Sequence, residues 1–257
     1  MRPERKIHRY VSRGTEMSNK KESQGLQILA IIPARGSSKG LANKNVLPLW
    51  GKPLITHTIE AALASSYRPR VIVTTDNEEI ARIARDAGAQ VPFMRPQTLA
   101  QDTTPMLPVV RHALERLRRN EQYRPELIVL LQPTSPLRRV QHIDAAIGLA
   151  LEPGTDSVVS VCEAEHPPCW MLTLDERGML RRLVMPGCSL TRRQDMPGIY
   201  RLNGAITVTR PQTIRQGKLM GSRSRALVMD RKESVDIDDE LDFLLAETLL
   251  GRTRRIR

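Results

Sequence analysis

Short, continuously apolar runs alternate along this chain with longer segments whose apolar residues recur at helical spacing. The runs occupy residues 26–33, 70–75, 127–131 and 156–162. Runs of this length are typical of strands buried on both faces, which occur in parallel sheets covered by helices. The alternation therefore predicts an α/β fold, with a mostly parallel central sheet, right-handed crossovers and helices on both faces.

Helical periodicity begins at Leu54 and returns in four later segments, and shorter apolar runs predict further strands. Asp76 or Asn77 can cap the second helix, and Gly88 can end it. The turn residues 50–53 precede the first helix. The later helices are expected at 78–87, 105–119, 140–151 and 239–250, and the further strands at 91–93, 203–209 and 225–229.

The length of 257 residues fits one large domain. Residues 1–25 are polar, charged and aperiodic, so we expect a disordered basic extension before a domain over 26–250. Residues 163–200 are rich in proline, glycine and arginine, which predicts an irregular insertion or β-rich arm. Residues 251–257 form a basic tail.

The net charge of +12 first suggests a nucleic-acid partner, but its distribution does not. The first 25 and the last seven residues carry +4 each, which leaves only +4 for the domain. Aromatic residues make up 3% of the chain, too few for a base-stacking surface. Nucleic acid is thus an unlikely partner, and binding through the basic termini is kept as the alternative from a different functional class.

Several features that the sequence lacks limit the cellular compartment and the kinds of cofactor that we expect. Its three cysteines form no CxxC pair, and its five histidines show no metal-ligand spacing. No apolar run approaches the ~20 residues of a membrane helix, and the first 25 residues lack the apolar stretch of a secretory signal. We therefore expect a cytoplasmic protein without a membrane association; whether Met17 is the true start stays open.

The loop over residues 33–45 follows the first apolar run. Gly36 and Gly40 would let the backbone approach a ligand closely, while hydroxyls and fixed cations suit a polyphosphate. Neither GxxxxGK[ST] nor GxGxxG is present, so a solvated surface turn is the alternative. The polar and basic candidates in this loop are Arg35, Ser37, Ser38, Lys39 and Lys44.

The full string IIPARGSSKGLANKN, followed by GKPLI, resembles the opening of the acylneuraminate cytidylyltransferase family. The likeness continues in order over residues 28–249. It implies a Rossmann-like nucleotidyltransferase fold and a reaction that couples CTP to an acidic nine-carbon sugar. It also assigns a group of residues in this loop to the nucleotide: Arg35, Ser38, Lys39, Lys44 and Asn45.

Two further motifs carry the resemblance. RPQTLAQDT begins at Arg95, and by resemblance Arg95, Thr104 and Met106 surround the cytosine and ribose. Without the family, Arg95 could be a surface charge and Asp102 a helix cap. LLQPTSPLR contains Gln132, whose amide is implied to face the sugar.

The stretches RRQD and YRLNGA resemble the family's acid-sugar elements. Arg192 is implied to be catalytic, and Arg193, Gln194, Tyr200 and Asn203 to bind the sugar. Arginine suits a carboxylate because it can bond both oxygens; a solvated basic arm is the alternative. In some family members these arginines come from a partner subunit, so a homodimer with a small dimerisation arm is expected.

Asp236 and Asp238 lie on one side of an extended segment if the chain alternates there. Two carboxylates plus phosphate oxygens are a usual set of ligands for Mg²⁺. The alternative is that Asp238 or Asp239 caps the last helix.

The implied reaction joins CTP to a free 2-keto-3-deoxy nonulosonic acid, giving a CMP-sugar for cell-surface glycans and pyrophosphate. Catalysis is assigned to Arg35, Lys39, Arg192, Asp236 and Asp238. A 3-deoxy-manno-octulosonate cytidylyltransferase is the alternative enzyme, although its loop usually continues as STRLPGKPL. Cys169 and Trp170 stand where sialate-specific relatives often carry lysine, which suggests a legionaminate-type sugar or a structural tryptophan.

Overall fold

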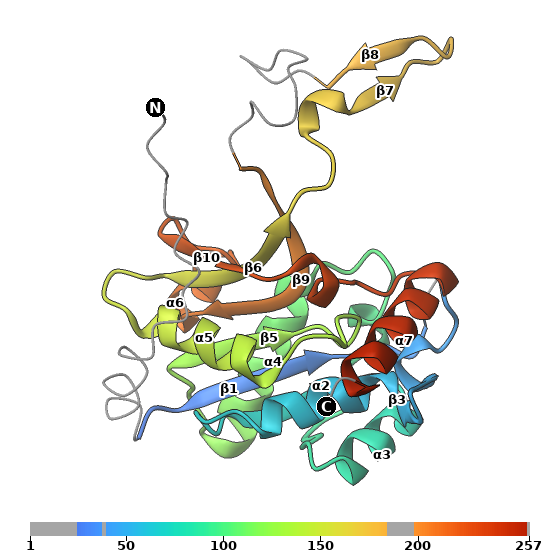
Figure 1. Ribbon diagram of the computed structural model, residues 1–257. Helices are drawn as coiled ribbons and strands as arrows, with labels where there is room; N and C mark the ends of the chain where they lie inside the picture. The colour runs from blue at the N-terminus through green and yellow to red at the C-terminus, as the bar shows by residue number, and fades with distance from the viewer. Residues whose placement is uncertain (1–24, 38–39, 184–197, 256–257) are drawn as a thin grey trace.

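The computed structural model describes residues 25–37, 40–183 and 198–255. A six-stranded sheet with the order β10-β6-β9-β5-β1-β4 crosses the centre of the molecule (Figure 1). Its strands are β1 (Ile28–Pro33), β4 (Arg70–Thr74), β5 (Leu127–Leu131), β6 (Ser157–Glu163), β9 (Tyr200–Thr209) and β10 (Ser224–Val228).

All strands of this sheet run in one direction except β9. Strand β1 pairs in parallel with β4 and β5, and β10 pairs in parallel with β6. Strand β9 lies antiparallel between β5 and β6. The predicted mostly parallel sheet is therefore confirmed, with one reversed strand that the apolar runs alone do not distinguish.

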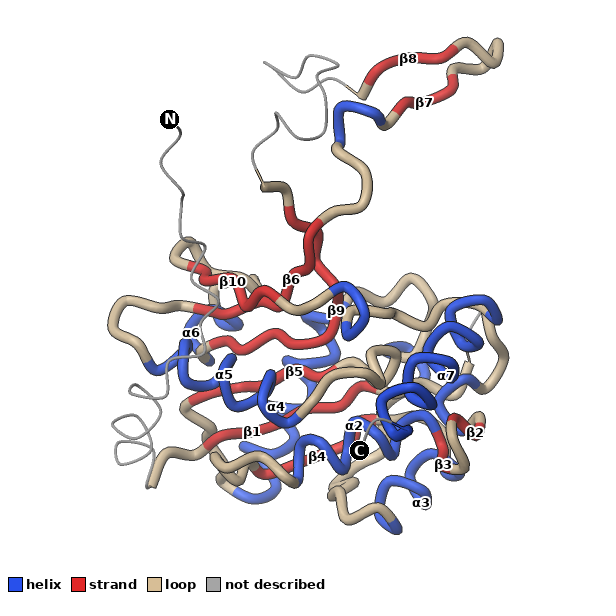
Figure 2. Tube along the Cα trace, viewed as in Figure 1, coloured by secondary structure: helices blue, strands red, loops and turns tan. Residues whose placement is uncertain are grey.

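Helices cover both faces of the sheet, as predicted (Figure 2). Alternate residues of β1 explain the two layers: Ile28, Ala30 and Ile32 pack with α2, α3 and α5, whereas Leu29 and Ile31 pack with α4 and α6. The helices are α2 (Leu54–Leu63), α3 (Glu78–Asp86), α4 (Met106–Glu121), α5 (Val140–Leu151), α6 (Pro211–Arg215) and α7 (Glu240–Arg255).

Three elements differ most from the sequence prediction. Residues 91–93 form no strand, and Gln90 alone bridges to Ile72 of β4. Strand β9 begins at Tyr200 rather than 203, because its first residues pair with the end of β6. Helix α7 continues through Arg255, so part of the expected basic tail is helical. The described chain has no helix long and apolar enough to cross a membrane.

Two small hairpins stand outside the central sheet. Strands β2 (Pro48–Leu49) and β3 (Lys52–Pro53) flank a turn in which Trp50 and Gly51 both have positive φ, the geometry of a type I′ turn. Strands β7 (Leu172–Leu174) and β8 (Leu180–Arg182) form an arm that projects away from the sheet (Figure 1). The arm lies within residues 163–200, where the sequence predicts an irregular insertion or β-rich arm, and its dimerising role stays a prediction.

Asn77 caps α3, which settles the choice left open between it and Asp76. Its side-chain oxygen accepts the Ile80 N–H at 3.0 Å. We predict that Asn77→Ala lowers the free energy of unfolding by about 1 kcal/mol, whereas Asn77→Asp retains the acceptor and most of the stability. Urea denaturation of the three proteins measures this; equal losses for Ala and Asp would contradict a capping role.

Candidate functional site

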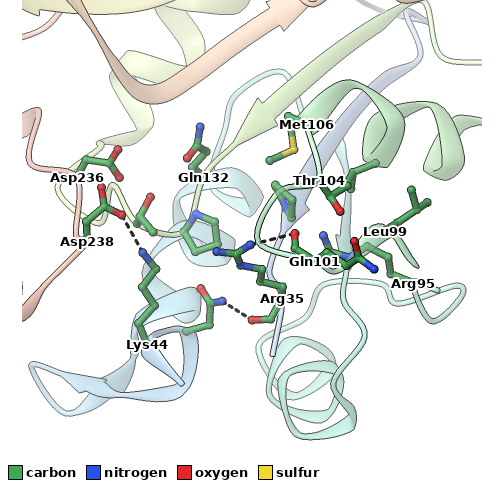
Figure 3. A pocket seen from close by; sticks show the side chains of 15 residues that line it. Arg35, Lys44, Arg95, Leu99, Gln101, Thr104, Met106, Gln132, Asp236 and Asp238 are labelled. Carbon is green, nitrogen blue, oxygen red and sulfur yellow. Dashed lines mark hydrogen bonds and ion pairs between the residues drawn. The ribbon is translucent and has the colours of Figure 1, made fainter. Parts of the chain in front are cut away.

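A pocket of about 230 Å³ opens where β1 and β5 end, beyond the carboxyl edge of the parallel strands (Figure 3). Open α/β sheets bind ligands at this edge. Its lining consists of Pro33, Arg35, Lys44, Asn45, Arg95, Leu99, Gln101, Thr104, Met106, Val109, Gln132, Pro133, Thr134, Asp236 and Asp238.

The loop after β1 brings Arg35 to the pocket. Its guanidinium donates to the Gln101 carbonyl at 3.1 Å and pairs with the Asp102 carboxylate at 2.8 Å. The Asn45 amide donates to the Arg35 carbonyl at 3.0 Å, and this hydrogen bond links the last residue of the loop to its beginning. Asp102 thus pairs with Arg35 and caps no helix, since α4 begins after Pro105.

Lys44 joins the same loop to the segment before α7. Its ammonium donates to the Ile237 carbonyl at 2.8 Å and to the Asp238 carboxylate at 3.0 Å. Asp239, and not Asp238, caps α7, because its carboxylate accepts the Asp242 N–H at 2.9 Å. The pocket therefore contains two loop cations, Arg35 and Lys44, each already paired with a carboxylate, and Arg95 is a third cation in its lining.

Asp236 is a partly buried carboxyl in the lining of the pocket. Burial raises the pKa of this carboxyl, the Thr134 hydroxyl beside it lowers the pKa, and the nearby Asp238 carboxylate adds to the rise while the Lys44 ammonium opposes it. Its Oδ1 atom is enclosed and has no hydrogen-bond partner in the described structure. A buried acceptor of this kind costs stability, so the site favours a cation or donor from outside the chain.

Arg95 is buried, which excludes the surface charge weighed from sequence. Its guanidinium donates to the Thr74 carbonyl at 2.9 Å, at the end of β4. Burial lowers the pKa of this guanidinium, Asp76 raises it and Arg35 lowers it. Asp76 also accepts the Gly36 N–H at 3.0 Å, so the ends of β1 and β4 are linked.

Arg138 holds the floor of the pocket although it does not line it. Its buried guanidinium donates to the carbonyls of Gln132 (3.1 Å) and Ala205 (2.8 Å) and to the Thr58 hydroxyl (2.6 Å). Complete burial lowers the pKa of Arg138 to about 9, so it stays protonated at neutral pH. The sequence analysis did not predict this role. Its only sign in the sequence is an arginine at the end of the loop that follows the apolar run of β5.

The structure brings together nine of the residues predicted for the site. These are Arg35, Lys44, Asn45, Arg95, Thr104, Met106, Gln132, Asp236 and Asp238. Five others lie outside the described residues: Ser38, Lys39, Arg192, Arg193 and Gln194.

Two predicted sugar contacts are described but do not line the pocket. Tyr200 is exposed at the start of β9, and Asn203 is buried with its amide bonded to Ser160 and Ser234. Trp170 is 44% exposed and belongs to none of the hydrophobic cores formed by the described residues.

Asp236 and Asp238 fit a divalent cation with few protein ligands. Among the described residues, no cluster of three or more His, Cys, Asp or Glu side chains could hold a metal. Mg²⁺ is commonly held by one or two carboxylates together with substrate phosphates and water. The unpartnered oxygen of Asp236 supports this fit.

A family model described as Cytidylyltransferase matches residues 29–166, more than half of the chain. The chain belongs to the cytidylyltransferase family. A CMP-N,N′-diacetyllegionaminic acid synthase of Legionella pneumophila is 38% identical over 229 residues, which cover 88% of this cytidylyltransferase and 97% of that relative. An N-acylneuraminate cytidylyltransferase of Escherichia coli O18:K1:H7 is 40% identical over 232 residues, 89% of this chain. The chain spans about half (53%) of that longer relative.

Solved structures share the fold at low sequence identity. A CMP:2-keto-3-deoxy-manno-octonic acid synthetase complexed with CTP superposes with a TM-score of 0.64 at 17% identity, covering 88% of this cytidylyltransferase and 99% of the other chain. A 4-diphosphocytidyl-2C-methyl-D-erythritol synthase from Anaerococcus prevotii gives 0.62 at 12%, over 89% and 100% of the two chains. These likenesses confirm the predicted nucleotidyltransferase fold.

The raised pKa of Asp236 predicts a trade-off between stability and function. The folded state holds this proton more tightly than the unfolded state, so the native protein loses stability as pH rises through the raised pKa. We expect Asp236→Asn to raise the melting temperature of the metal-free protein at neutral pH, and the gain to vanish under acidic conditions. Asp86→Asn is the control, because that carboxylate is exposed on α3 and does not line the pocket. A gain independent of pH would disprove the electrostatic cause.

Proposed function

We propose that this cytidylyltransferase joins CTP to a nonulosonic acid, either an N-acylneuraminate or a legionaminate, and releases pyrophosphate. The observation that carries the proposal is a single pocket that combines two loop cations with a carboxylate pair. The named activities of the Legionella and Escherichia coli relatives support the sugar class.

The triphosphate would exchange the internal ion pairs of the pocket for stronger ones. Arg35 and Lys44 are held by Asp102 and Asp238 in the free protein. A triphosphate carries more negative charge than either carboxylate, so both cations would turn toward it while remaining within reach. By family resemblance, Ser38 and Lys39 would add phosphate contacts, and Arg95, Thr104 and Met106 would surround the nucleoside.

Asp236 and Asp238 would hold Mg²⁺ against the phosphates. The ion would supply positive charge that stabilises the departing pyrophosphate. Within the chain, Lys44 would leave Asp238 as the nucleotide arrives, which frees a carboxylate oxygen for the metal. The positive charge of the cation would then offset the cost of partly burying the Asp236 carboxylate.

The sugar's anomeric hydroxyl would attack the α-phosphorus in line, forming the new P–O bond as the bond to pyrophosphate breaks. Chemistry of this kind depends on positioning and charge neutralisation more than on covalent catalysis. Gln132 borders the pocket on the side of β9, where an acid sugar would lie. The proposed contacts from Arg192, Arg193, Gln194 and Tyr200 rest on the family resemblance.

The reaction predicts pyrophosphate release from CTP and Mg²⁺ in the presence of a nonulosonic acid. A panel of N-acetylneuraminate, legionaminate and 3-deoxy-manno-octulosonate identifies the sugar, with turnover expected for a nine-carbon acid. Asp238→Asn should lower turnover by about 10- to 100-fold, because a lost metal contact weakens Mg²⁺ binding. Asp239→Asn is the matched control, since that side chain caps α7.

Release with the eight-carbon acid alone would favour the alternative octulosonate enzyme. The absence of pyrophosphate release with every acid of the panel would contradict the proposed function. The nucleic-acid alternative predicts instead a salt-dependent affinity for nucleic acid, most of which is lost when residues 1–25 and 251–257 are removed.

We also propose that the protein forms a homodimer through the arm. Both arm strands expose apolar side chains, and Leu174 and Leu180 stand opposite each other with 69% and 66% of their surfaces exposed. Further exposed apolar residues nearby are Trp170, Met171, Leu172, Met179 and Leu183. Exposed apolar side chains gathered on one projecting arm are typical of a subunit contact.

Light scattering coupled to size exclusion tests the dimer. We predict a dimer for the native protein and a monomer for Leu174→Asp combined with Leu180→Asp, because two charges would be buried in the contact. Thr173→Asp is the control, since successive side chains of a strand point to opposite faces. A native protein that is monomeric at all concentrations would contradict the proposal.

A further inference from the structure

The Asn203 amide is used entirely inside the protein. Its oxygen accepts the Ser160 hydroxyl at 2.6 Å and the Ala205 N–H at 3.2 Å. Its nitrogen donates to the Ser234 hydroxyl at 2.8 Å and lies 3.4 Å from the sulfur of Met229. Only 1% of Asn203 is exposed, so it offers no free group to a sugar.

These bonds join three separate parts of the chain. Ser160 lies at an irregularity in the pairing of β6 with β9, where the register shifts between Val159 and Val161. Such bulges redirect a side chain, and here the Ser160 hydroxyl also accepts the Ile206 N–H at 2.7 Å. Asn203 therefore stands on a rigid base formed by β6 and β9.

The far end of the network holds the segment that follows β10. The Ser234 hydroxyl accepts from Asn203 and donates to the Asp230 carbonyl at 2.9 Å. Ser234 is buried, and it precedes Asp236 by two residues. Immediately after Asp236, the Ile237 N–H donates to the Thr134 carbonyl at 2.8 Å. Asp236 is thus anchored on both sides.

The two anchors matter because outward movement of the Asp236 segment would be favourable for the carboxylate. Its carboxyl is partly buried, its enclosed Oδ1 has no hydrogen-bond partner among the described residues, and rotating the segment outward would expose that charge to water. The Gln132 amide and the Asp236 carboxylate both lie close to Gly204, which follows Asn203 directly. The hydrogen bonds of Asn203, the residue directly before Gly204, oppose this outward movement of Asp236.

We infer that Asn203 and Ser234 are positioning residues that hold Asp236 at the metal site and touch neither substrate nor cation. The inference rests on the proposed function for the identity of the cation. It differs from the sequence prediction, which assigned Asn203 to the sugar.

Ser234→Ala, Ser234→Thr and Ser157→Ala test this role. Ser234→Ala removes the hydroxyl without adding bulk, and Ser234→Thr keeps it. Ser157→Ala is the matched control: Ser157 is equally buried on β6, and its hydroxyl bonds Ser224 and Gly221 far along the chain from Asp236.

We expect Ser234→Ala to raise the Mg²⁺ concentration for half-maximal pyrophosphate release by about 10- to 100-fold, as for other residues that orient metal ligands. The KM for CTP at saturating Mg²⁺ should change little. Two readouts need no turnover: Mn²⁺ binding followed by electron paramagnetic resonance should weaken, and hydrogen exchange at residues 235–237 should quicken. Ser157→Ala should alter none of these.

Equal metal dependence for Ser234→Ala and Ser157→Ala, in folded proteins, would overturn the inference, as would unchanged exchange at 235–237. Restored Mn²⁺ binding in Ser234→Thr would support it. If the native protein forms no CMP-sugar with any acid, the proposed function fails, while the exchange and Mn²⁺ measurements still decide the positioning role.

Discussion

Parallel pairing of β1 with both β4 and β5 is the constraint on which the site depends. Because the three strands run in one direction, their carboxyl ends meet at a single edge, and the segments that follow them converge. Arg35 arrives from β1, Arg95 from the segment bound to the end of β4, and Gln132 from β5. Residues as far apart in sequence as Arg35 and Gln132 thereby share one pocket.

Electrostatic balance within this pocket follows from that convergence. Arg35 and Lys44 would repel each other in an empty site, and each is neutralised by a carboxylate from a distant segment. Asp236 has no such partner for its enclosed oxygen, and Asn203 and Thr134 hold its segment inward. The ligand-free protein thus has a carboxylate oxygen without a partner beside the loop that is proposed to hold phosphates, and a bound cation would balance its charge.

Much of the architecture could be predicted because burial leaves a direct trace in residue order. Continuous apolar runs marked four strands to within two residues, and α5 was predicted at both ends. The 91–93 run failed because a three-residue apolar stretch can fill a core without pairing. Nine of the predicted site residues were found, whereas the roles of Arg138 and Asp102 were missed, although both lie in the quoted motifs, because these roles depend on partners remote in sequence.

The sequence by itself determined the alternation of strands and helices, the polar loop after β1 and the membership of the family. These properties depend on local periodicity and residue type, which are read without knowing any long-range contact. Tertiary structure alone decided that β9 is reversed, that Asp102 pairs with Arg35, and that Asn203 binds Ser160 and Ser234. Hydrogen-bond partners are set by which strands become neighbours, and that choice is made only when the whole core packs.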